Sequence, residues 1–262
     1  MWSGGAGPEP RRVSLAPIWG GYEGVYGGRV IAELAAAVDV VDGMDLLTAQ
    51  VEFFGTVRAG EVQVAVEVRH QGRVSASVEA VMLQGHERAR CTAKLARVVA
   101  DRVGDAIVPP GDLPDPEMLP VFEPAYWTRL DHCRLLDLRL VEHAVTDRGR
   151  ITRVWIRLVD EHPEVALLPR VGRIACIVDG VPPALFFADP IPAYVPTVDL
   201  TLHLRPGGEA DASGWCYAES RLVWATDDFC LEEVTLWNAG GDLLGQARQN
   251  RRVVLADQVA SS

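Results

Sequence analysis

Hydrophobic and polar residues alternate along several stretches of this chain, which is typical of strands with one buried face. The clearest case is 61–70, where four valines at every second position share one face. Short turns rich in glycine and polar residues separate these stretches. The pattern predicts strands over 13–18, 46–57, 61–70, 73–83 and 88–99, and again over 137–145, 150–159, 195–206, 214–225, 230–238 and 242–255.

Two stretches show helical spacing instead. The first begins at Gly27-Gly28 and continues through 30–38 with an alanine-rich apolar face. The second has apolar residues at helical spacing from Leu167 to Val178 and carries one carboxylate, Asp179. It should end near the proline pair at 182–183, because proline cannot continue the helical hydrogen bonds. A carboxylate in an apolar setting needs a partner or has a chemical role.

The order of helix and strands occurs twice, which indicates a duplicated unit with two antiparallel sheets side by side. An alignment of the two halves places Lys94 opposite Gln249. We predict a flexible N-terminus over 1–12, a first repeat over 13–100, a proline-rich linker over 101–125, a second repeat over 126–256 and a tail over 257–262. Each sheet must wrap a helix to bury that helix's apolar face, giving an α+β fold.

The composition narrows the class of protein. The net charge of −11 argues against a nucleic-acid partner. No apolar run reaches the ~20 residues of a membrane span, and the N-terminus lacks a signal-peptide core, so we expect a cytoplasmic protein. The histidines show no metal-ligand spacing, so no metal or other cofactor is expected. The five cysteines are widely spaced and fit reduced, buried thiols.

These features together resemble a known family. The glycine-rich entry to an alanine-rich helix, VYGGRVIAEL at 25–34, followed by a long antiparallel meander, is similar to the hotdog fold. Two copies in one chain resemble the double-hotdog acyl-CoA thioesterases of the type II class. The segment VDGVPPALF at 178–186 resembles the part of that family that carries its acidic residue, and the likeness extends over about 13–255.

The resemblance implies a site as well as a fold. In that family an Asp, a Thr or Ser, and a Gln hold the attacking water, and these positions fall on Asp179, Thr197 and Gln249. Coenzyme A would then be part of the acyl-CoA substrate. Asp179 would act as general base or orient the water, and backbone amides at Gly27 and Gly28 would stabilise the oxyanion. Arg248, Arg251 and Arg252 are candidates for contacts with the coenzyme A phosphates.

Structural interpretations of the same residues stay open. Asp179 would also fit as a carboxylate that bonds backbone amides near the helix end. The apolar face of 195–206 is expected to hold Val198, so Thr197 falls on the opposite face unless a bend at Pro196 turns it. Gln249 fits a surface strand glutamine equally well. The arginines also fit a charged edge strand.

Three functions are therefore compared. The first is hydrolysis of a fatty acyl-CoA by an activated water. The second is a non-catalytic acyl-thioester-binding protein that keeps the fold. The third is a hotdog enoyl-thioester hydratase or dehydratase, whose GD-x-N-P-x-H type motif the sequence lacks. Exposed strand edges in a half-repeat fold favour a homodimer or higher homo-oligomer.

Overall fold

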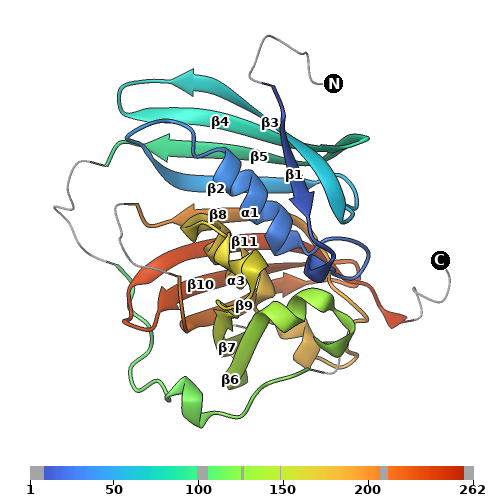
Figure 1. The fold of residues 1–262 in the computed structure, drawn as a ribbon. Coiled ribbons are helices and arrows are strands. Elements are labelled where there is room, and N and C mark those ends of the chain that lie inside the picture. Colours follow the sequence, from blue (N-terminus) through green and yellow to red (C-terminus); the bar gives the residue numbers. More distant parts are fainter. Residues whose placement is uncertain (1–8, 99–105, 125–126, 148, 207–211, 257–262) are drawn as a thin grey trace.

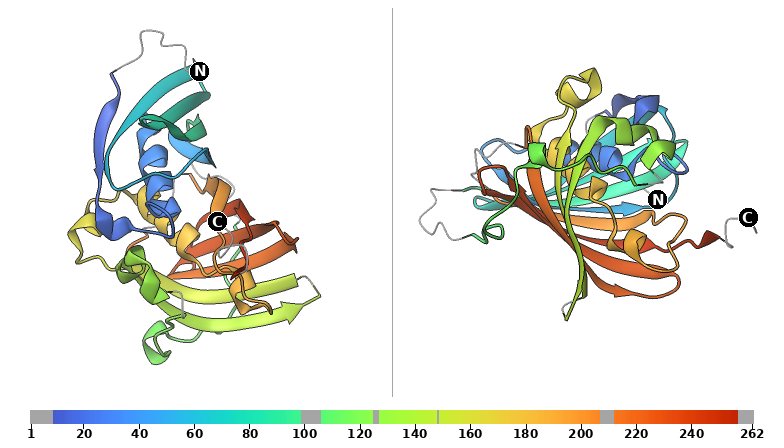
Figure 2. Two further views of the ribbon diagram at one scale, coloured as in Figure 1. Left: turned by 90° about the vertical axis from the view of Figure 1, so that its right-hand side faces the viewer. Right: turned by 90° about the horizontal axis from the view of Figure 1, so that it is seen from below.

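The structure is a computed structural model that describes residues 9–98, 106–124, 127–147, 149–206 and 212–256. Its strands form one antiparallel sheet of eleven strands, in the order β1-β3-β4-β5-β2-β8-β11-β10-β9-β7-β6. The sheet curves behind two helices, α1 and α3 (Figures 1 and 2). This is the double hotdog fold, with each half of the sheet wrapped around one helix.

The first repeat occupies one half of the sheet. Its elements are β1 (Arg11–Leu15), the 3-10 helix η1 (Pro17–Trp19), α1 (Gly27–Ala37), β2 (Asp45–Phe53), β3 (Gly60–Gln71), β4 (Ser75–Gln84) and β5 (His86–Ala96). Of the valines on one face of β3, only those that lie over the core are buried. Val62 and Val64 are buried, whereas Val68 near the far end of the strand is exposed.

The second repeat again has a long helix followed by four strands, but two strands and additional short helices precede that helix. Its elements are the 3-10 helices η3 (Trp127–Arg129) and η4 (Asp131–Leu135), β6 (Leu136–Thr146), β7 (Gly149–Leu158), α2 (Pro163–Ala166), α3 (Arg170–Gly180), η5 (Ala184–Phe187), β8 (Thr197–Leu204), β9 (Cys216–Ala225), β10 (Phe229–Asn238) and β11 (Leu243–Arg252). As predicted, α3 ends just before the proline pair at 182–183.

The two halves meet through a strand pair rather than as separate sheets. β2 pairs antiparallel with β8, with Ala49 opposite Leu202 and Val51 opposite Leu200. The prediction of two sheets side by side is therefore refined to one continuous sheet. Its inner face and the helices share one large core, because buried residues of both repeats belong to the same hydrophobic cluster.

Helices α1 and α3 lie side by side and run in opposite directions (Figure 1). The start of α1 meets the end of α3, where Gly27 approaches Asp179. Farther along, Gly172 near the start of α3 approaches Ala32. The small residues of both helices allow this close approach, as the alanine-rich pattern predicted.

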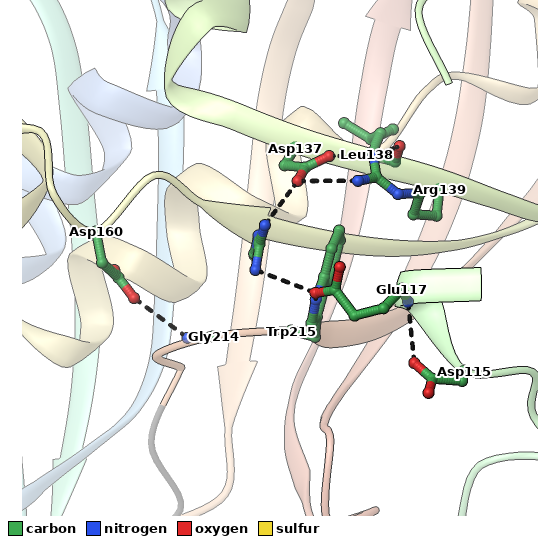
Figure 3. A network of polar contacts seen from close by, with 9 residues as sticks. Asp115, Glu117, Asp137, Leu138, Arg139, Asp160, Gly214 and Trp215 are labelled. Atoms are coloured by element: carbon green, nitrogen blue, oxygen red, sulfur yellow. Dashed lines mark hydrogen bonds and ion pairs between the residues drawn. The ribbon is translucent and has the colours of Figure 1, made fainter. Parts of the chain in front are cut away.

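The proline-rich segment crosses the outer face of the second half of the sheet, and it includes the 3-10 helix η2 (Pro116–Met118). Three tryptophans hold it there by donating indole N–H bonds: Trp155 to the Pro114 carbonyl, Trp237 to the Ile107 carbonyl and Trp215 to the Glu117 carboxylate. Figure 3 shows the network around Trp215. Arg139 and Arg157 stack over its ring at 5.2 and 4.3 Å and both pair with Asp137.

Two details of the sequence interpretation are wrong. Arg11 and Arg12 were assigned to a flexible N-terminus but lie in β1, where they pair with Val64 and Gln63 of β3. Lys94 is not equivalent to Gln249: Lys94 points outward to Ser77, whereas Gln249 points into the core. The rest of the expected N-terminal segment up to residue 8 and the tail over 257–262 lie outside the described residues.

Candidate active site

A cavity of about 450 Å³ opens where the start of α1 meets the end of α3. Asp179, Thr197 and Arg251 line it together with Gly27. Its remaining walls are largely apolar and aromatic, and they come from residues before α1, from the end of β2 and from the segment after α3. An apolar cleft with a few convergent polar groups is the usual form of a small-molecule site.

Asp179 is a buried acidic residue that lines this cavity. It lies in the last turn of α3 and is only 8% exposed, yet its carboxylate has defined partners. Oδ1 accepts a hydrogen bond of 2.9 Å from the Thr197 hydroxyl and lies 3.5 Å from an Arg251 nitrogen. Oδ2 accepts no hydrogen bond from the described residues and faces Gly27.

A β-bulge turns Thr197 into the site. In the pairing of β8 with β11, Asp199 faces Asn250, but Arg251 faces Thr197, so Val198 is skipped. Skipping one residue reverses which side chains face inward at the start of the strand. Val198 is therefore 37% exposed instead of buried, which corrects its predicted place on the core face, and Thr197 reaches Asp179.

Arg251 joins this group from the neighbouring strand. Its guanidinium donates to the Thr197 hydroxyl at 3.1 Å and to the Val195 carbonyl at 3.2 Å, and its Nε lies 3.1 Å from Glu232 Oε2. Burial alone would lower the pKa of Arg251, but the carboxylates of Asp179 and Glu232 raise it overall, so the guanidinium stays charged.

The first turn of α1 supplies backbone donors beside Asp179. The amides of Arg29 and Val30 bond the Tyr26 carbonyl, whereas those of Gly27 and Gly28 bond nothing among the described residues. Unpaired amides at a helix N-terminus bind negative charge, and the helix dipole adds to this. The helix thus begins, at Gly27, beside the carboxylate oxygen that accepts no hydrogen bond from the described residues.

Three buried side chains support this end of α1. The Tyr26 hydroxyl donates to the Cys176 carbonyl at 2.6 Å, and its ring stacks on His132 at 4.0 Å. Burial, with the negative charge of Asp179, raises the pKa of Tyr26, so the hydroxyl keeps its proton. Burial raises the pKa of Cys133 to about 12, so this cavity-lining thiol is protonated and poorly suited as a nucleophile.

Of the other predicted site residues, Gly28, Gln249 and Arg248 are not among the residues that line the cavity, whereas Arg251 is. Gln249 faces inward on β11, is 1% exposed and leaves its Oε1 without a hydrogen bond, but it is not among the residues that line the cavity. Arg248 points to the outer face and pairs with Glu233 at 3.0 Å. Arg251 is buried against two carboxylates, which leaves it poorly placed for a phosphate. Arg252 lines the cavity and is exposed.

Glu232 is a site residue that the sequence interpretation missed. It is 1% exposed, and it accepts a 2.8 Å hydrogen bond from the Ala184 amide. Its position in the apolar alternation of β10 carried a signal, because a glutamate on the buried face of a strand requires a partner.

No group of three potential metal ligands occurs in the described part of the chain. The described helices include none long and apolar enough to cross a membrane.

Solved structures with the same fold cover nearly the whole chain. A hot dog fold protein of unknown function from Alicyclobacillus acidocaldarius is 19% identical, with a TM-score of 0.77 over 94% of this chain and 93% of that one. The tesB protein of Mycobacterium avium subspecies paratuberculosis is 16% identical, with a TM-score of 0.75 over 95% of both chains. The acyl-CoA thioesterase II TesB2 of Mycobacterium marinum is 16% identical, with a TM-score of 0.70 over 88% and 90%.

The family models match the sequence in two parts. The model of the acyl-CoA thioesterase N-terminal domain matches residues 15–100, and that of the C-terminal domain matches residues 108–253. No curated protein matches the sequence. The two matched ranges coincide with the two structural repeats and together leave out little of the chain. This protein therefore belongs to the acyl-CoA thioesterase family and is a thioester hydrolase built from two hotdog repeats.

Proposed function

We propose that this protein hydrolyses a fatty acyl-CoA to the free acid and coenzyme A, with Asp179 activating the water. The observation that carries the proposal is the position of Asp179 Oδ2. This oxygen accepts no hydrogen bond from the described residues. It faces the start of α1, where the amides of Gly27 and Gly28 have no bond to any described residue. A base beside an oxyanion site is the arrangement that acyl transfer to water requires.

The reaction balances with these groups alone. Water bound at Asp179 Oδ2 attacks the thioester carbonyl carbon and gives its proton to the carboxylate. The carbonyl electrons move to the oxygen, which the amides of Gly27 and Gly28 stabilise as an oxyanion. When the carbonyl re-forms, the bond to sulfur breaks and the leaving thiolate takes the proton from Asp179. The products are the acid and the coenzyme A thiol, with no covalent intermediate on the protein.

The cavity walls suit the two parts of this substrate. Phe53, Phe54 and Phe186 provide apolar surface for an acyl chain. The side chain of Arg252 makes no hydrogen bond or ion pair with the described residues, and Arg252 is an exposed residue of the cavity wall. We assign Arg252, rather than Arg248 or Arg251, to the contact with a coenzyme A phosphate, because a guanidinium recognises phosphate with paired donors.

The test is release of free thiol from acyl-CoAs of graded chain length. Asp179→Asn keeps the size of the side chain but removes the base, so kcat should fall by about 100- to 10,000-fold. Undetectable release by the folded wild-type protein would contradict the proposed substrate. Full activity of Asp179→Asn would contradict the site assignment alone. Binding of acyl-CoA without turnover would instead support the non-catalytic alternative.

Oligomeric state and cellular location stay predictions from the sequence. Strands β1 and β6 are the two edges of the described sheet, and each has one side without a partner strand among the described residues. Such edges are surfaces through which copies of a chain pair. Light scattering of the purified protein would distinguish a monomer from the predicted dimer or higher oligomer.

A further inference from the structure

The proposed hydrolysis needs only a base and an oxyanion site. The residues around Asp179 nevertheless include a buried positive charge. Arg251 is 5% exposed and lies between the carboxylates of Asp179 and Glu232. Burying three charges in one group is costly unless their arrangement is defined, and removal of one partner leaves the others uncompensated. A buried arginine beside the proposed base therefore requires a structural or functional explanation.

The hydrogen bonds fix the direction of the Thr197 hydroxyl. Arg251 has only donors, so its contact of 3.1 Å with Thr197 Oγ1 makes that oxygen the acceptor. The hydroxyl proton must then point elsewhere, and Asp179 Oδ1 lies 2.9 Å away. Arg251 thus directs Thr197 to donate to the carboxylate instead of accepting from another group.

The same contacts distinguish the two oxygens of Asp179. Oδ1 receives the Thr197 hydroxyl and lies 3.5 Å from Arg251, whereas Oδ2 faces Gly27 and the start of α1. One hydrogen bond and one ion pair on Oδ1 hold the plane of the carboxylate. The attacking water is left with Oδ2, on the side where the oxyanion donors lie.

Glu232 in turn holds Arg251. Its Oε2 lies 3.1 Å from Arg251 Nε, and its Oε1 accepts the Ala184 amide at 2.8 Å. Ala184 begins η5, and the neighbouring Pro182 and Pro183 line the cavity. Glu232 therefore joins the guanidinium to the segment that forms one wall of the site. Burial raises the pKa of Glu232 overall, although Arg251 and the Ala184 amide act in the opposite direction by stabilising the carboxylate.

We propose that Arg251, held by Glu232, is a positioning residue for this hydrolysis: it occupies Asp179 Oδ1 and orients Thr197, so that Oδ2 holds the water. The inference rests on the proposed function of Asp179. It adds two residues whose work is to fix the geometry of the base, and neither needs to touch the substrate. Such fixing lowers the entropic part of the barrier.

The test compares kcat and KM of Arg251→Lys, Arg251→Ala and Glu232→Gln with the wild type. Lysine keeps the charge but not the planar set of donors, so we expect kcat to fall about tenfold, and about 100-fold in Arg251→Ala, with KM changed less than about twofold. Glu232→Gln keeps an acceptor for Ala184 but weakens the hold on Arg251, and we expect an intermediate loss of kcat. Added guanidinium should restore part of the activity of Arg251→Ala.

A matched control is Arg221→Ala, which removes an arginine that pairs with Glu233 on the outer face. Thermal unfolding identifies any variant that fails to fold. Glu232→Gln keeps the inference testable if the Arg251 variants do not fold, because it leaves one buried positive charge, on Arg251, and one buried negative charge, on Asp179. Folded Arg251→Lys and Glu232→Gln with wild-type kcat would overturn the inference. If Asp179→Asn is inactive in the same assays, the proposed function stands while the inference fails.

Discussion

Gly27→Ala adds only a methyl group, and we expect it to lower activity while stability changes little. A Cβ added there would lie 2.9 Å from Asp179 Oδ2 and 3.7 Å from the Phe53 ring. Ordinary contacts of a Cβ begin near 3.4 Å. The carboxylate or the start of α1 must therefore move by about half an ångström in Gly27→Ala, and the new methyl group occupies the space proposed for water.

The size of the effect follows from this displacement. Misplacement of a reacting group by about 1 Å costs about 100-fold in rate. We therefore expect kcat/KM of Gly27→Ala to fall by about 10- to 100-fold, equivalent to about 1.4 to 2.7 kcal/mol of transition-state stabilisation. Stability should change little, because the gain of about 0.4–1 kcal/mol from replacing glycine in a helix opposes the close contact.

The assay is thiol release from one acyl-CoA over a range of concentrations, with thermal unfolding measured on the same samples. Gly111→Ala is the matched control, since no atom lies within 4 Å of its added Cβ. Its kinetics should equal those of the wild type. A folded Gly27→Ala protein with wild-type kcat/KM would refute the placement of the water between Asp179 and α1.

The remaining predictions concern three other residues. Thr197→Val keeps the shape but loses the hydroxyl bonded to Asp179, so kcat should fall by about tenfold or more, and Thr197→Ser should retain most activity. Burial lowers the pKa of His132 below 6.5, so the unfolded chain binds more protons and the free energy of unfolding should decrease as pH falls through 6.5. Urea titrations across pH should show a smaller decrease in His132→Gln. Trp155→Phe loses the bond to the Pro114 carbonyl, so chemical denaturation should show a loss of about 1–3 kcal/mol with kcat unchanged. Equal pH dependence in wild type and His132→Gln, or equal stability in Trp155→Phe, would contradict the respective argument.

The helices and strands could be predicted because each has a strong local signal. The alternation over 61–70 and the proline pair at 182–183 depend only on short-range chemistry, and the corresponding elements lie where the pattern placed them. The junction between the repeats had no such signal. Pairing of β2 with β8 joins residues about 150 positions apart, and sheet order at that distance is set by packing.

The candidate site was predicted in part. Asp179 and Gly27 do face each other, since a helix end fixes both. Thr197 required the bulge at Val198, which reverses the facing that strict alternation predicts. Arg251 was predicted to contact a coenzyme A phosphate, but it points inward, where it lies beside Asp179 and the buried Glu232 of the adjacent strand. Gln249 stays a prediction, because it faces inward but away from the residues that line the cavity.

The antiparallel pair of α1 and α3 has two ends, and the duplicated fold offers an equivalent place at each. Both helices have eleven residues, but the position of Asp179 in α3 is Ala36 in α1. The inward face of β11 carries Gln249 and Arg251, whereas that of β5 carries Ala89, Cys91, Ala93 and Leu95. At the start of α3, Arg170 and Val171 stand where α1 has Gly27 and Gly28. Among the described residues, the groups of the proposed site therefore lie at one end only. We expect one catalytic centre per chain, so titration of active sites should count chains instead of repeats.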